Sequence, residues 1–521
     1  MATVRMLRRR GFDGPLTVLS DEPHLPYQRP PLSKEFLRVD AGSADLVLLD
    51  ETWAAAHDVE LRTGAAVTAV APGRVELGDG SHVNADAVLL ATGVRARTLP
   101  GVSGDRVVHL RTVGDAVRLR DALPGLRRLV VVGGGLIGAE VASSARELGI
   151  EVVVLEAGPL PMLGALGPDM AAFCAGLYRA HGVDLRCGRE ISAVAPTGAG
   201  VVVDTSSGPV EADLVVVAVG SVPRDELARA AGIAVDPVRG GVVVDELCRT
   251  SAPGVFAAGD LACRPAGEGF VRMEHVDNAT TQGGTVARAL LGKTVPPPEA
   301  PWFWSDQFGL NLQFVGHAPA GADVVVRGQR RRPRLHRLLP DRRPRARRVL
   351  RRARRGRPGR PGPARTRRPG APRAARRRRP RPVRPARHHH RLRRHAVDFH
   401  KIARSGQVPE GVVRRFFAGE VEVAVSRSEG EVHATSNYCS HLDCLLSSGK
   451  VTDEGLLCSC HGSVFDYTSG EPLCPPATRP ITVFPVREEE GHIWVGVDDE
   501  LAEAAMRRRA VGVRRLGDAA G

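Results

Sequence analysis

The clearest hydrophobic pattern in the chain lies between residues 129 and 156. An apolar run at 129–132, three of its four residues valine, is typical of a buried strand, and three consecutive glycines end it. Apolar residues at helical spacing follow from Leu136 to Leu148, and Gly149 is suited to end a helix. A second apolar run closes on Glu156. The pattern predicts a strand, a helix and a second strand.

Glycines stand where such a unit needs them to bind a dinucleotide. Gly133, Gly135 and Gly138 fill the spacing G-x-G-x-x-G between strand and helix. The first lets the strand turn tightly, the second lets a pyrophosphate approach the backbone, and the third lets helix and strand pack closely. The positive end of the helix then points at the phosphates. Glu156 can accept a hydrogen bond from a ribose 2′-hydroxyl, and no arginine follows it, which favours NADH over NADPH.

Shorter apolar runs indicate two kinds of domain. In the first three hundred residues they alternate with helical patterns, which predicts an α/β part with strands at 16–19, 88–93 (closing on a turn at 91–93), 201–204, 214–219 and 255–257. After residue 398 only short β patterns remain, at 421–425, 432–435, 481–486 and 492–497. We therefore expect a multidomain chain, α/β first and all-β last.

Targeting signals are few. No run of about eighteen apolar residues occurs, so we expect no membrane span. The start, MATVRMLRRRGF, lacks the apolar core of a secretory signal, which favours the cytoplasm. Five of the nine cysteines lie in the last hundred residues, and this clustering favours a metal centre over a disulfide scaffold.

One segment differs in composition from the rest of the chain. Residues 330–394 hold 30 Arg, no Lys and one acid, a local charge of +29 in a chain of +15, so the remainder carries −14. Basic runs usually indicate nucleic acid, but no aromatic residue is present here to stack on bases, so we expect no nucleic-acid partner. Arg, Pro, Gly and Ala have GC-rich codons, and a frameshifted reading is our first interpretation. A disordered linker is the second interpretation, and true nucleic-acid binding is the third. The histidines at 388–390 lie in the same segment, so we do not interpret them as a metal site.

The α/β part resembles the FAD-dependent ferredoxin reductases of oxygenase systems. Residues 27–34, YQRPPLSK, are similar to the Y-x-R-P-P-L-S-K stretch that this family carries beside its flavin. The resemblance implies that Lys34 is catalytic and lies near the flavin ring, with Arg29 near the FAD phosphates. A proline-stiffened loop with a solvated lysine is the alternative.

Further motifs carry the same resemblance. Glu140 matches a catalytic carboxylate near the nicotinamide, with a solvated helix residue as the alternative; Arg111 matches an arginine near the flavin, with pairing to Asp115 as the alternative. Asp260, after a predicted strand, would accept a hydrogen bond from the FAD ribityl chain. The cofactor-binding residues implied for FAD and NADH are Arg29, Lys34, Thr92, Gly93, Arg111, Gly133, Gly135, Gly138, Glu156, Gly259, Asp260, Glu274, His275 and Val276.

The chain departs from this family in two places. The family opens with its own strand, glycine loop and helix for the FAD pyrophosphate, and this chain starts partway through that helix. We expect the upstream DNA to encode the missing unit; otherwise FAD loses its main phosphate cradle. Residues 301–307, PWFWSDQ, open the family's small C-terminal domain, which helps to dock the iron–sulfur partner, but the resemblance ends after residue 327. Another reading frame from codon 328 onward is expected to complete that domain.

Two cysteine–histidine pairs resemble those of a Rieske 2Fe–2S domain. A C-x-H at 439–441 and a C-x-x-H at 458–461 are separated by sixteen residues. The resemblance implies that one iron takes the thiolates of Cys439 and Cys458 and the other takes the imidazoles of His441 and His461. Neutral imidazoles in place of thiolates raise the reduction potential. A zinc site is the alternative.

Neighbouring residues refine this comparison. Cys444 and Cys460 match positions that form a disulfide between the two cluster loops in Rieske proteins of cytochrome bc complexes, although both could instead be thiols. Ser463 matches a serine that donates to a cluster sulfur. Phe465 stands where those proteins have a tyrosine, so one hydrogen bond is missing and we expect a somewhat lower potential.

The expected fold is therefore a two-dinucleotide-domain α/β flavoprotein and a small all-β Rieske domain, joined by a disordered segment rich in Arg and Pro. The expected divisions are an FAD-binding domain in two parts (1–100, without its phosphate loop, and 225–300), an NAD-binding domain (101–224), an incomplete reductase C-terminal domain (301–328), the Arg/Pro-rich segment (329–397), the Rieske domain (398–498) and a basic tail (499–521).

This organisation predicts electron transfer from NADH through FAD to a Rieske 2Fe–2S cluster, and on to a terminal oxygenase or another acceptor. No C-x-x-C or C-x₄-C occurs in the flavoprotein half, which excludes a redox-active disulfide of the glutathione reductase kind. Three alternatives are an NADH oxidase or redox sensor resembling apoptosis-inducing factor, a non-functional frameshifted product, and a basic nucleic-acid-binding protein.

Overall fold

A computed structural model provides the fold of the chain. It describes residues 1–38, 46–198, 200–266, 269–297, 300–316, 325–328, 335–339, 348–352, 397–441, 444–452, 455–460, 462–474, 477 and 479–511. The predicted strand–helix–strand unit forms as β9 (Arg128–Val132), α4 (Leu136–Glu147) and β10 (Glu151–Glu156). Its strand residues Leu129, Val130 and Val131 are fully buried, as the apolar run requires.

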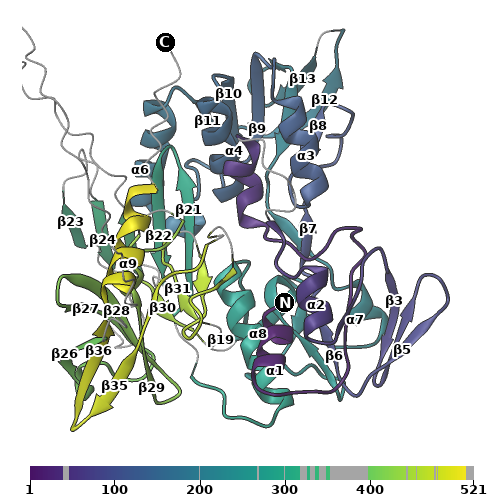
Figure 1. The fold of residues 1–521 in the computed structure, drawn as a ribbon. Helices are drawn as coiled ribbons and strands as arrows, with labels where there is room; N and C mark the ends of the chain where they lie inside the picture. The colour runs from purple at the N-terminus through teal and green to yellow at the C-terminus, as the bar shows by residue number, and fades with distance from the viewer. Residues whose placement is uncertain are drawn as a thin grey trace, which may run out of the picture.

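This unit is the centre of a five-stranded parallel sheet of order β11-β10-β9-β15-β8, at the top of Figure 1. The other elements of the domain are β8 (Val107–His109), α3 (Val113–Ala122), α5 (Leu163–Leu166), α6 (Pro168–Ala180), β11 (Asp184–Cys187), β12 (Ile191–Pro196), β13 (Val201–Thr205), β14 (Val210–Ala212) and β15 (Leu214–Val217). Because all five strands are parallel, their carboxyl ends lie at one edge, where Gly133 follows β9 and Glu156 ends β10.

The flavin half contains two separate parallel strand pairs. One pair is β1 (Leu16–Leu19) with β2 (Val59–Arg62), and the other is β6 (Val88–Leu90) with β18 (Val255–Ala257). No ladder of described residues joins the two pairs. Smaller sheets and helices surround them: α2 (Glu51–Ala56), β3 (Val67–Ala71), β4 (Arg74–Leu77), β5 (His82–Asn84), β7 (Val94–Ala96), β16 (Ser221–Pro223), α7 (Glu226–Ala230), β17 (Val242–Val243), β19 (Ala262–Ala266) and β20 (Gly269–Arg272).

Helices α1 (Ala2–Arg9) and α8 (Val276–Leu290) pack closely in this half. The Thr3 hydroxyl donates to the Gly283 carbonyl at 3.0 Å. A Cβ atom at Gly283 would lie 2.7 Å from that of Ala2, so glycine allows the two helices to approach. A helix is therefore present at residues 2–9, where one was expected.

The small domain after residue 300 is larger than expected. Strands β21 (Trp302–Gln307), β22 (Leu310–Val315), β23 (Val325–Gly328), β24 (Leu335–Leu339) and β25 (Arg348–Arg352) form one sheet of order β21-β22-β25-β24-β23. Two of these strands, β24 and β25, lie inside the segment for which we expected no secondary structure, and that expectation is wrong for them. Apart from these two strands and Val397, residues 329–397 lie outside the described residues, so the linker and frameshift interpretations stay predictions.

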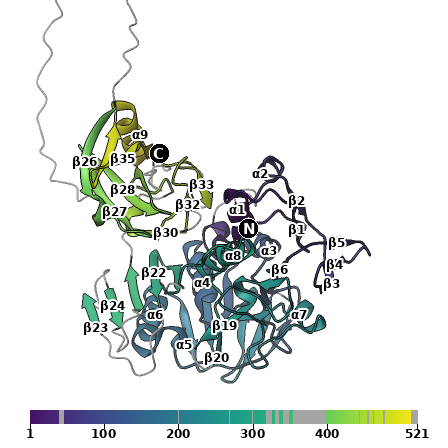
Figure 2. The same ribbon diagram turned by 90° about the horizontal axis from the view of Figure 1, so that it is seen from below.

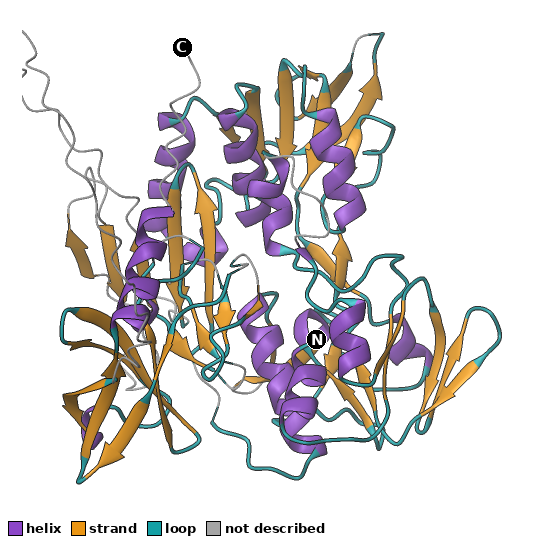
Figure 3. Cartoon of the chain, in the orientation of Figure 1, coloured by secondary structure: helices purple, strands orange, loops and turns teal. Residues whose placement is uncertain are grey.

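The last domain consists mainly of strands, as predicted (Figure 3). Its larger sheets are built from β26 (Asp398–Arg404), β27 (Val413–Ala418), β28 (Val421–Ser428), β29 (Glu431–Ser436), β34 (Val483–Phe484), β35 (Val486–Glu489) and β36 (His492–Val497). A four-stranded subdomain of β30 (Lys450–Val451), β31 (Leu456–Leu457), β32 (Val464–Phe465) and β33 (Pro472–Cys474) carries the metal-site motifs. Within the expected basic tail, α9 runs over Asp499–Val511, and 512–521 lie outside the described residues.

The β30–β33 subdomain faces the flavin half and the small sheet of β21 and β22 (Figures 1 and 2). Lys450 of β30 forms an ion pair with Asp277 of α8 at 3.5 Å. None of the helices described here is long and apolar enough to cross a membrane.

Candidate functional site

The three fingerprint glycines occupy three different environments. A Cβ at Gly133, whose φ is +98°, would lie 2.4 Å from the Ala218 carbonyl oxygen, and one at Gly138 would lie 2.0 Å from the Gly133 oxygen. Both positions therefore require glycine for packing. A Cβ at Gly135, the N-cap of α4, would meet no atom of the described residues within 4 Å. That open approach to a helix N-terminus suits a pyrophosphate, so the loop fits a dinucleotide.

The Glu156 carboxylate is held beside this loop by backbone donors. Its two oxygens accept hydrogen bonds from the Gly134 N–H at 2.8 Å and the Gly158 N–H at 2.7 Å. The guanidinium of Arg189, on the neighbouring chain segment, donates to the Ser207 hydroxyl. The arrangement fixes this carboxylate beside the glycine loop, and its contact with a ribose stays a prediction.

NADH is expected to reduce the flavin at least about tenfold more efficiently than NADPH, a gap of about 1.4 kcal/mol. The Glu156 carboxylate would repel a 2′-phosphate but accept a hydrogen bond from a 2′-hydroxyl. Stopped-flow reduction with each nucleotide measures the ratio, and Glu156→Gln, which removes the charge, should narrow it. Equal rates in the unaltered protein would contradict the assignment.

Lys34 and Glu140 form a buried ion pair. Their side chains are 8 % and 4 % exposed, and the ammonium lies 3.0 Å from the carboxylate. Glu140 also accepts from the hydroxyls of Ser33 and Ser305, the latter at 2.6 Å, while Lys34 donates to the Pro30 carbonyl at 2.9 Å. The alternatives of a solvated lysine and a solvated helix glutamate are therefore wrong. The structure brings both predicted catalytic residues to one place.

The guanidinium of Arg111 pairs with Asp260 at 2.9 Å. Asp115, its alternative partner, instead caps α3 together with Thr112 and accepts from the Arg111 backbone N–H. A Cβ at Gly93 would lie 3.3 Å from the guanidinium, which places the Ala-Thr-Gly turn beside this pair. Four predicted FAD residues, Thr92, Gly93, Arg111 and Asp260, thus lie close in sequence or space.

The predicted phosphate contact Arg29 is already well bonded within the protein. Its guanidinium binds Glu22 at 2.6 Å and donates to the Arg111 carbonyl at 2.9 Å and the Tyr27 hydroxyl at 3.0 Å. Burial, with the hydrogen bond to Glu22, raises the pKa of Tyr27 to about 12, so its hydroxyl stays protonated at neutral pH. A role for Arg29 at the FAD phosphates stays a prediction.

The remaining FAD candidates surround the start of α8. The Gly259 N–H donates to the Gln282 side chain at 2.6 Å, and Glu274 pairs with Arg272 at 2.5 Å. His275, the N-cap residue, stacks on Phe303 of β21 with a ring separation of 4.0 Å, and Val276 is 41 % exposed. These contacts connect the flavin half directly to the small C-terminal sheet.

The four cysteines of the flavoprotein half form no disulfide. Burial raises the pKa of Cys174 and of Cys248 to about 12, which makes both thiols poor nucleophiles. The exclusion of a redox-active disulfide agrees with these environments.

The metal-site cysteines lie together in the core of the β30–β33 subdomain. Cys439 and Cys458 are 3 % and 0 % exposed and form no disulfide. Cys444 and Cys460 are bonded to each other, which confirms the predicted pair and excludes two thiols. The sulfurs of Cys444, Cys458 and Cys460 lie within 4.8 Å of one another, so the two loops meet at the predicted centre.

Two buried thiols beside the half-buried His441 form a donor set that fits one 2Fe–2S cluster, with thiolates for one iron and imidazole for the other. The fourth predicted ligand, His461, lies outside the described residues. The hydroxyl oxygen of Ser463 accepts from the Ala477 N–H at 3.0 Å. Its own hydrogen can then be donated, as the comparison with Rieske proteins implies.

Phe465→Tyr is expected to raise the reduction potential of the cluster. Phe465 is fully buried in this core, and the nearby Tyr467 hydroxyl is bonded to the carbonyls of Thr452 and Gly455, both at 2.8 Å. A new hydroxyl at 465 would add a donor near the sulfurs and stabilise the reduced, more negative cluster. Protein-film voltammetry measures the shift. The exposed Phe417→Tyr is the control, and a shift to lower potential in the Phe465 variant would contradict the assignment.

A cavity of about 310 Å³ lies between the flavin half and the metal-site loops. Lys34 and Val276 contribute to its wall from the flavin side. Gly462, in the loop that follows Cys458, and Val464 of β32 contribute from the Rieske side. Trp304 of β21 lines it between them. The sequence did not predict this shared cavity, because no local pattern indicates that the flavin half, β21 and the metal-site loops lie together in space.

Comparisons with known proteins agree with this geometry. Residues 1–283 match the family described as pyridine nucleotide-disulphide oxidoreductase, and residues 398–485 match the Rieske [2Fe–2S] domain. Residues 302–378 match the reductase C-terminal domain. This last match corrects our expectation that the resemblance ends after residue 327.

Reductases of known systems are similar over most of their length. Rhodocoxin reductase of Rhodococcus erythropolis is 41% identical over 331 residues, which is 62% of this chain and 77% of that protein. The ferredoxin–NAD(+) reductase subunit of the benzene 1,2-dioxygenase system of Pseudomonas putida is 40% identical over 334 residues, 63% of this chain and 80% of that protein. The covalent putidaredoxin reductase–putidaredoxin complex matches with a TM-score of 0.64 at 34% identity, covering 67% of this chain and 86% of that chain. The chain therefore belongs to the pyridine nucleotide-disulphide oxidoreductase family as an FAD-dependent reductase of the ferredoxin–NAD(+) type, and it carries a Rieske [2Fe–2S] domain after its reductase C-terminal domain.

Proposed function

We propose that the chain passes electrons from NADH through FAD to its own Rieske cluster, and from there to a terminal acceptor such as an oxygenase. The observation that carries this proposal is the shared cavity, because Lys34 on the flavin side and Gly462 on the cluster side line the same space. The dioxygenase system named for the Pseudomonas relative supports an oxygenase as the acceptor.

Different residues of the chain bind the nucleotide, the flavin and the cluster in this proposal. Gly135 and the N-terminus of α4 bind the NADH pyrophosphate, and Glu156 binds its ribose. When bound, FAD accepts a hydride, which is two electrons and one proton together. The cluster, when bound, holds one electron at a time. Glu140 fixes the Lys34 ammonium, which would lie beside the flavin, and the buried Cys439 and Cys458 would hold one iron as thiolates.

Anaerobic reduction of the holoprotein by NADH tests this function. The flavin absorbance should bleach first, and the EPR signal of the reduced cluster should follow without any added ferredoxin. A cluster that stays oxidised while the flavin is fully reduced would contradict the proposal. Rapid NADH oxidation once O₂ is admitted to the sample would then favour the oxidase alternative.

A further inference from the structure

The side of the β21–β22 hairpin that faces away from the reductase core carries polar residues that contact the Rieske domain. Along β22, Leu310, Leu312 and Phe314 point into the core of the reductase, while Asn311 and Gln313 alternate onto the opposite face. Asn311 is nevertheless only 8 % exposed, because the cluster-binding loop covers it. A strand that normally presents polar residues to water here presents them to another domain.

The orientation of both amides follows from their neighbours. Asp306, directly opposite Asn311 in the hairpin, can only accept, so the Asn311 amide must turn its NH₂ group toward it, at 2.8 Å. The Asn311 oxygen then faces Gln313, which must supply its own NH₂ group, at 2.8 Å. The Asp306 carboxylate thereby sets the orientation of the Asn311 and Gln313 amides, so that both present their NH₂ groups as donors. We call Asp306, Asn311 and Gln313 the amide bracket.

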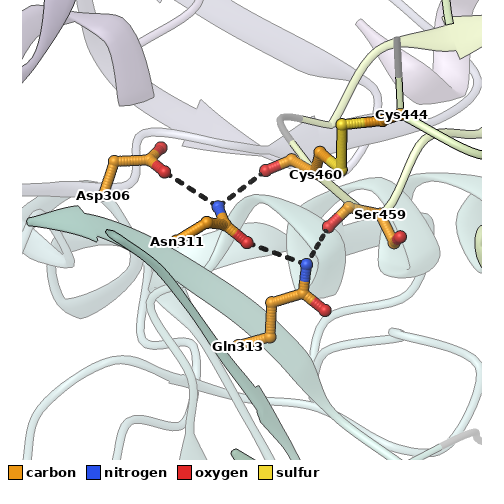
Figure 4. Close-up of a disulfide and its surroundings, with 6 residues drawn as sticks. All are labelled: Asp306, Asn311, Gln313, Cys444, Ser459 and Cys460. Atoms are coloured by element: carbon orange, nitrogen blue, oxygen red, sulfur yellow. Dashed lines mark hydrogen bonds between the residues drawn. A yellow bond between two sulfur atoms is a disulfide. The ribbon is translucent and has the colours of Figure 1, made fainter. Parts of the chain in front are cut away.

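The bracket binds two consecutive backbone carbonyls of the cluster loop (Figure 4). Asn311 donates to the Cys460 carbonyl at 2.8 Å and Gln313 donates to the Ser459 carbonyl at 2.6 Å. These carbonyls follow the ligand Cys458 directly, and Cys460 is tied to the other cluster loop by its disulfide with Cys444. Contact through carbonyls recognises the shape of a loop and not its side chains.

Other contacts support the same docking position. The Trp304 ring lies so close to Gly462 that a Cβ there would come within 2.7 Å of it. Lys450 of the Rieske domain pairs with Asp277 at the start of α8, at 3.5 Å. Both contacts border the cavity that Lys34 lines from the flavin side.

We propose that the amide bracket is a recognition site for the cluster-binding loop of this chain's own Rieske domain, and that it holds the cluster in position to receive electrons from the flavin. The inference rests on the proposed function and adds the residues that specify the contact. Each docked transfer moves one electron from the reduced flavin to the oxidised cluster. Two transfers restore the oxidised flavin and release the proton that arrived with the hydride, and both electrons pass on to a one-electron acceptor such as ferricyanide.

The test uses the full-length holoprotein with two kinds of variant. Gln313→Glu is isosteric and turns a donor into a carboxylate facing two oxygens, those of Ser459 and Asn311. Asn311→Leu combined with Gln313→Leu removes both donors without adding charge. Asn84→Asp, an exposed amide on β5, is the matched control for the change in charge.

In stopped-flow experiments NADH should reduce the flavin at the same rate in every protein. Electron transfer from flavin to cluster should slow at least about tenfold in both bracket variants, because an unpaired buried carbonyl shifts a docking equilibrium by about that factor. Asn84→Asp should not change it. The rate in the unaltered protein should also be independent of protein concentration; a rate proportional to concentration would assign the contact to a second copy and overturn the proposal.

Hydrogen exchange supplies a second readout that does not depend on activity. Amides of residues 456–465 and 302–315 should lose protection in the bracket variants while the iron content stays unchanged. Unchanged protection and unchanged rates would overturn the docking assignment. A cluster that NADH never reduces in the unaltered protein would instead defeat the proposed function, and the exchange data would still decide whether the bracket holds the loop.

Discussion

Replacing Cys458 with serine is expected to remove the 2Fe–2S cluster and, with it, all electron transfer beyond the flavin. Cys458 is fully buried between the two loops, and a serine hydroxyl does not ionise to replace a thiolate ligand. Iron analysis should fall to near background and the cluster EPR signal should vanish. Reduction of the flavin by NADH should continue, because the nucleotide site lies in a different domain.

Cys174→Ser is the matched control for this variant. It exchanges sulfur for oxygen at another fully buried site, in α6 of the NAD domain, far from the cluster loops in sequence. Iron content should be unaffected there. A Cys458 variant that retains its iron, or a purified chain that carries zinc and no iron, would contradict the Rieske assignment.

Lys34→Met should destabilise the protein by about 3–5 kcal/mol, the cost typical of removing one partner from a buried ion pair. The carboxylate of Glu140, 4 % exposed, would lose the ammonium that balances its charge and keep only the hydroxyls of Ser33 and Ser305 as donors. Combining the change with Glu140→Gln removes that charge and should recover most of the loss. The midpoint of urea denaturation of the reductase domains measures both effects.

An exposed pair provides the comparison for the Lys34 variant. Arg128 and Glu151 lie 3.1 Å apart, but their side chains are 45 % and 67 % exposed, so Arg128→Met should cost about 1 kcal/mol or less. Equal losses in the Arg128 and Lys34 variants would show that burial adds nothing to the Lys34–Glu140 pair.

Local patterns predicted the parts of this molecule that local sequence determines. The β9–α4–β10 unit was predicted because the glycine spacing, the apolar runs and Glu156 all lie within thirty residues. The disulfide between Cys444 and Cys460 was likewise correct, since short motifs on two neighbouring loops placed both residues.

Contacts between distant segments could not be predicted in this way. Whether Glu140 is solvated or buried depends on Ser305, which is 165 residues away, and the choice between two partners of Arg111 depends on Asp260, 149 residues away. Asn311 and Gln313 look like ordinary polar residues of an exposed strand face. Their role becomes visible only when the Rieske loop is seen against them.

The two separate strand pairs of the flavin half have a consequence for cooperativity. Pairs such as β1–β2 and β6–β18 bury little backbone on their own, whereas the five-stranded sheet of the NAD domain supports each inner strand from both sides. The flavin half is therefore expected to open locally before the NAD domain does. FAD binds only the closed form, so excess cofactor at about a hundred times its dissociation constant would add about 2.7 kcal/mol to this half alone. Folding of the flavin half and loading of its cofactor then become one equilibrium, set by the cofactor supply.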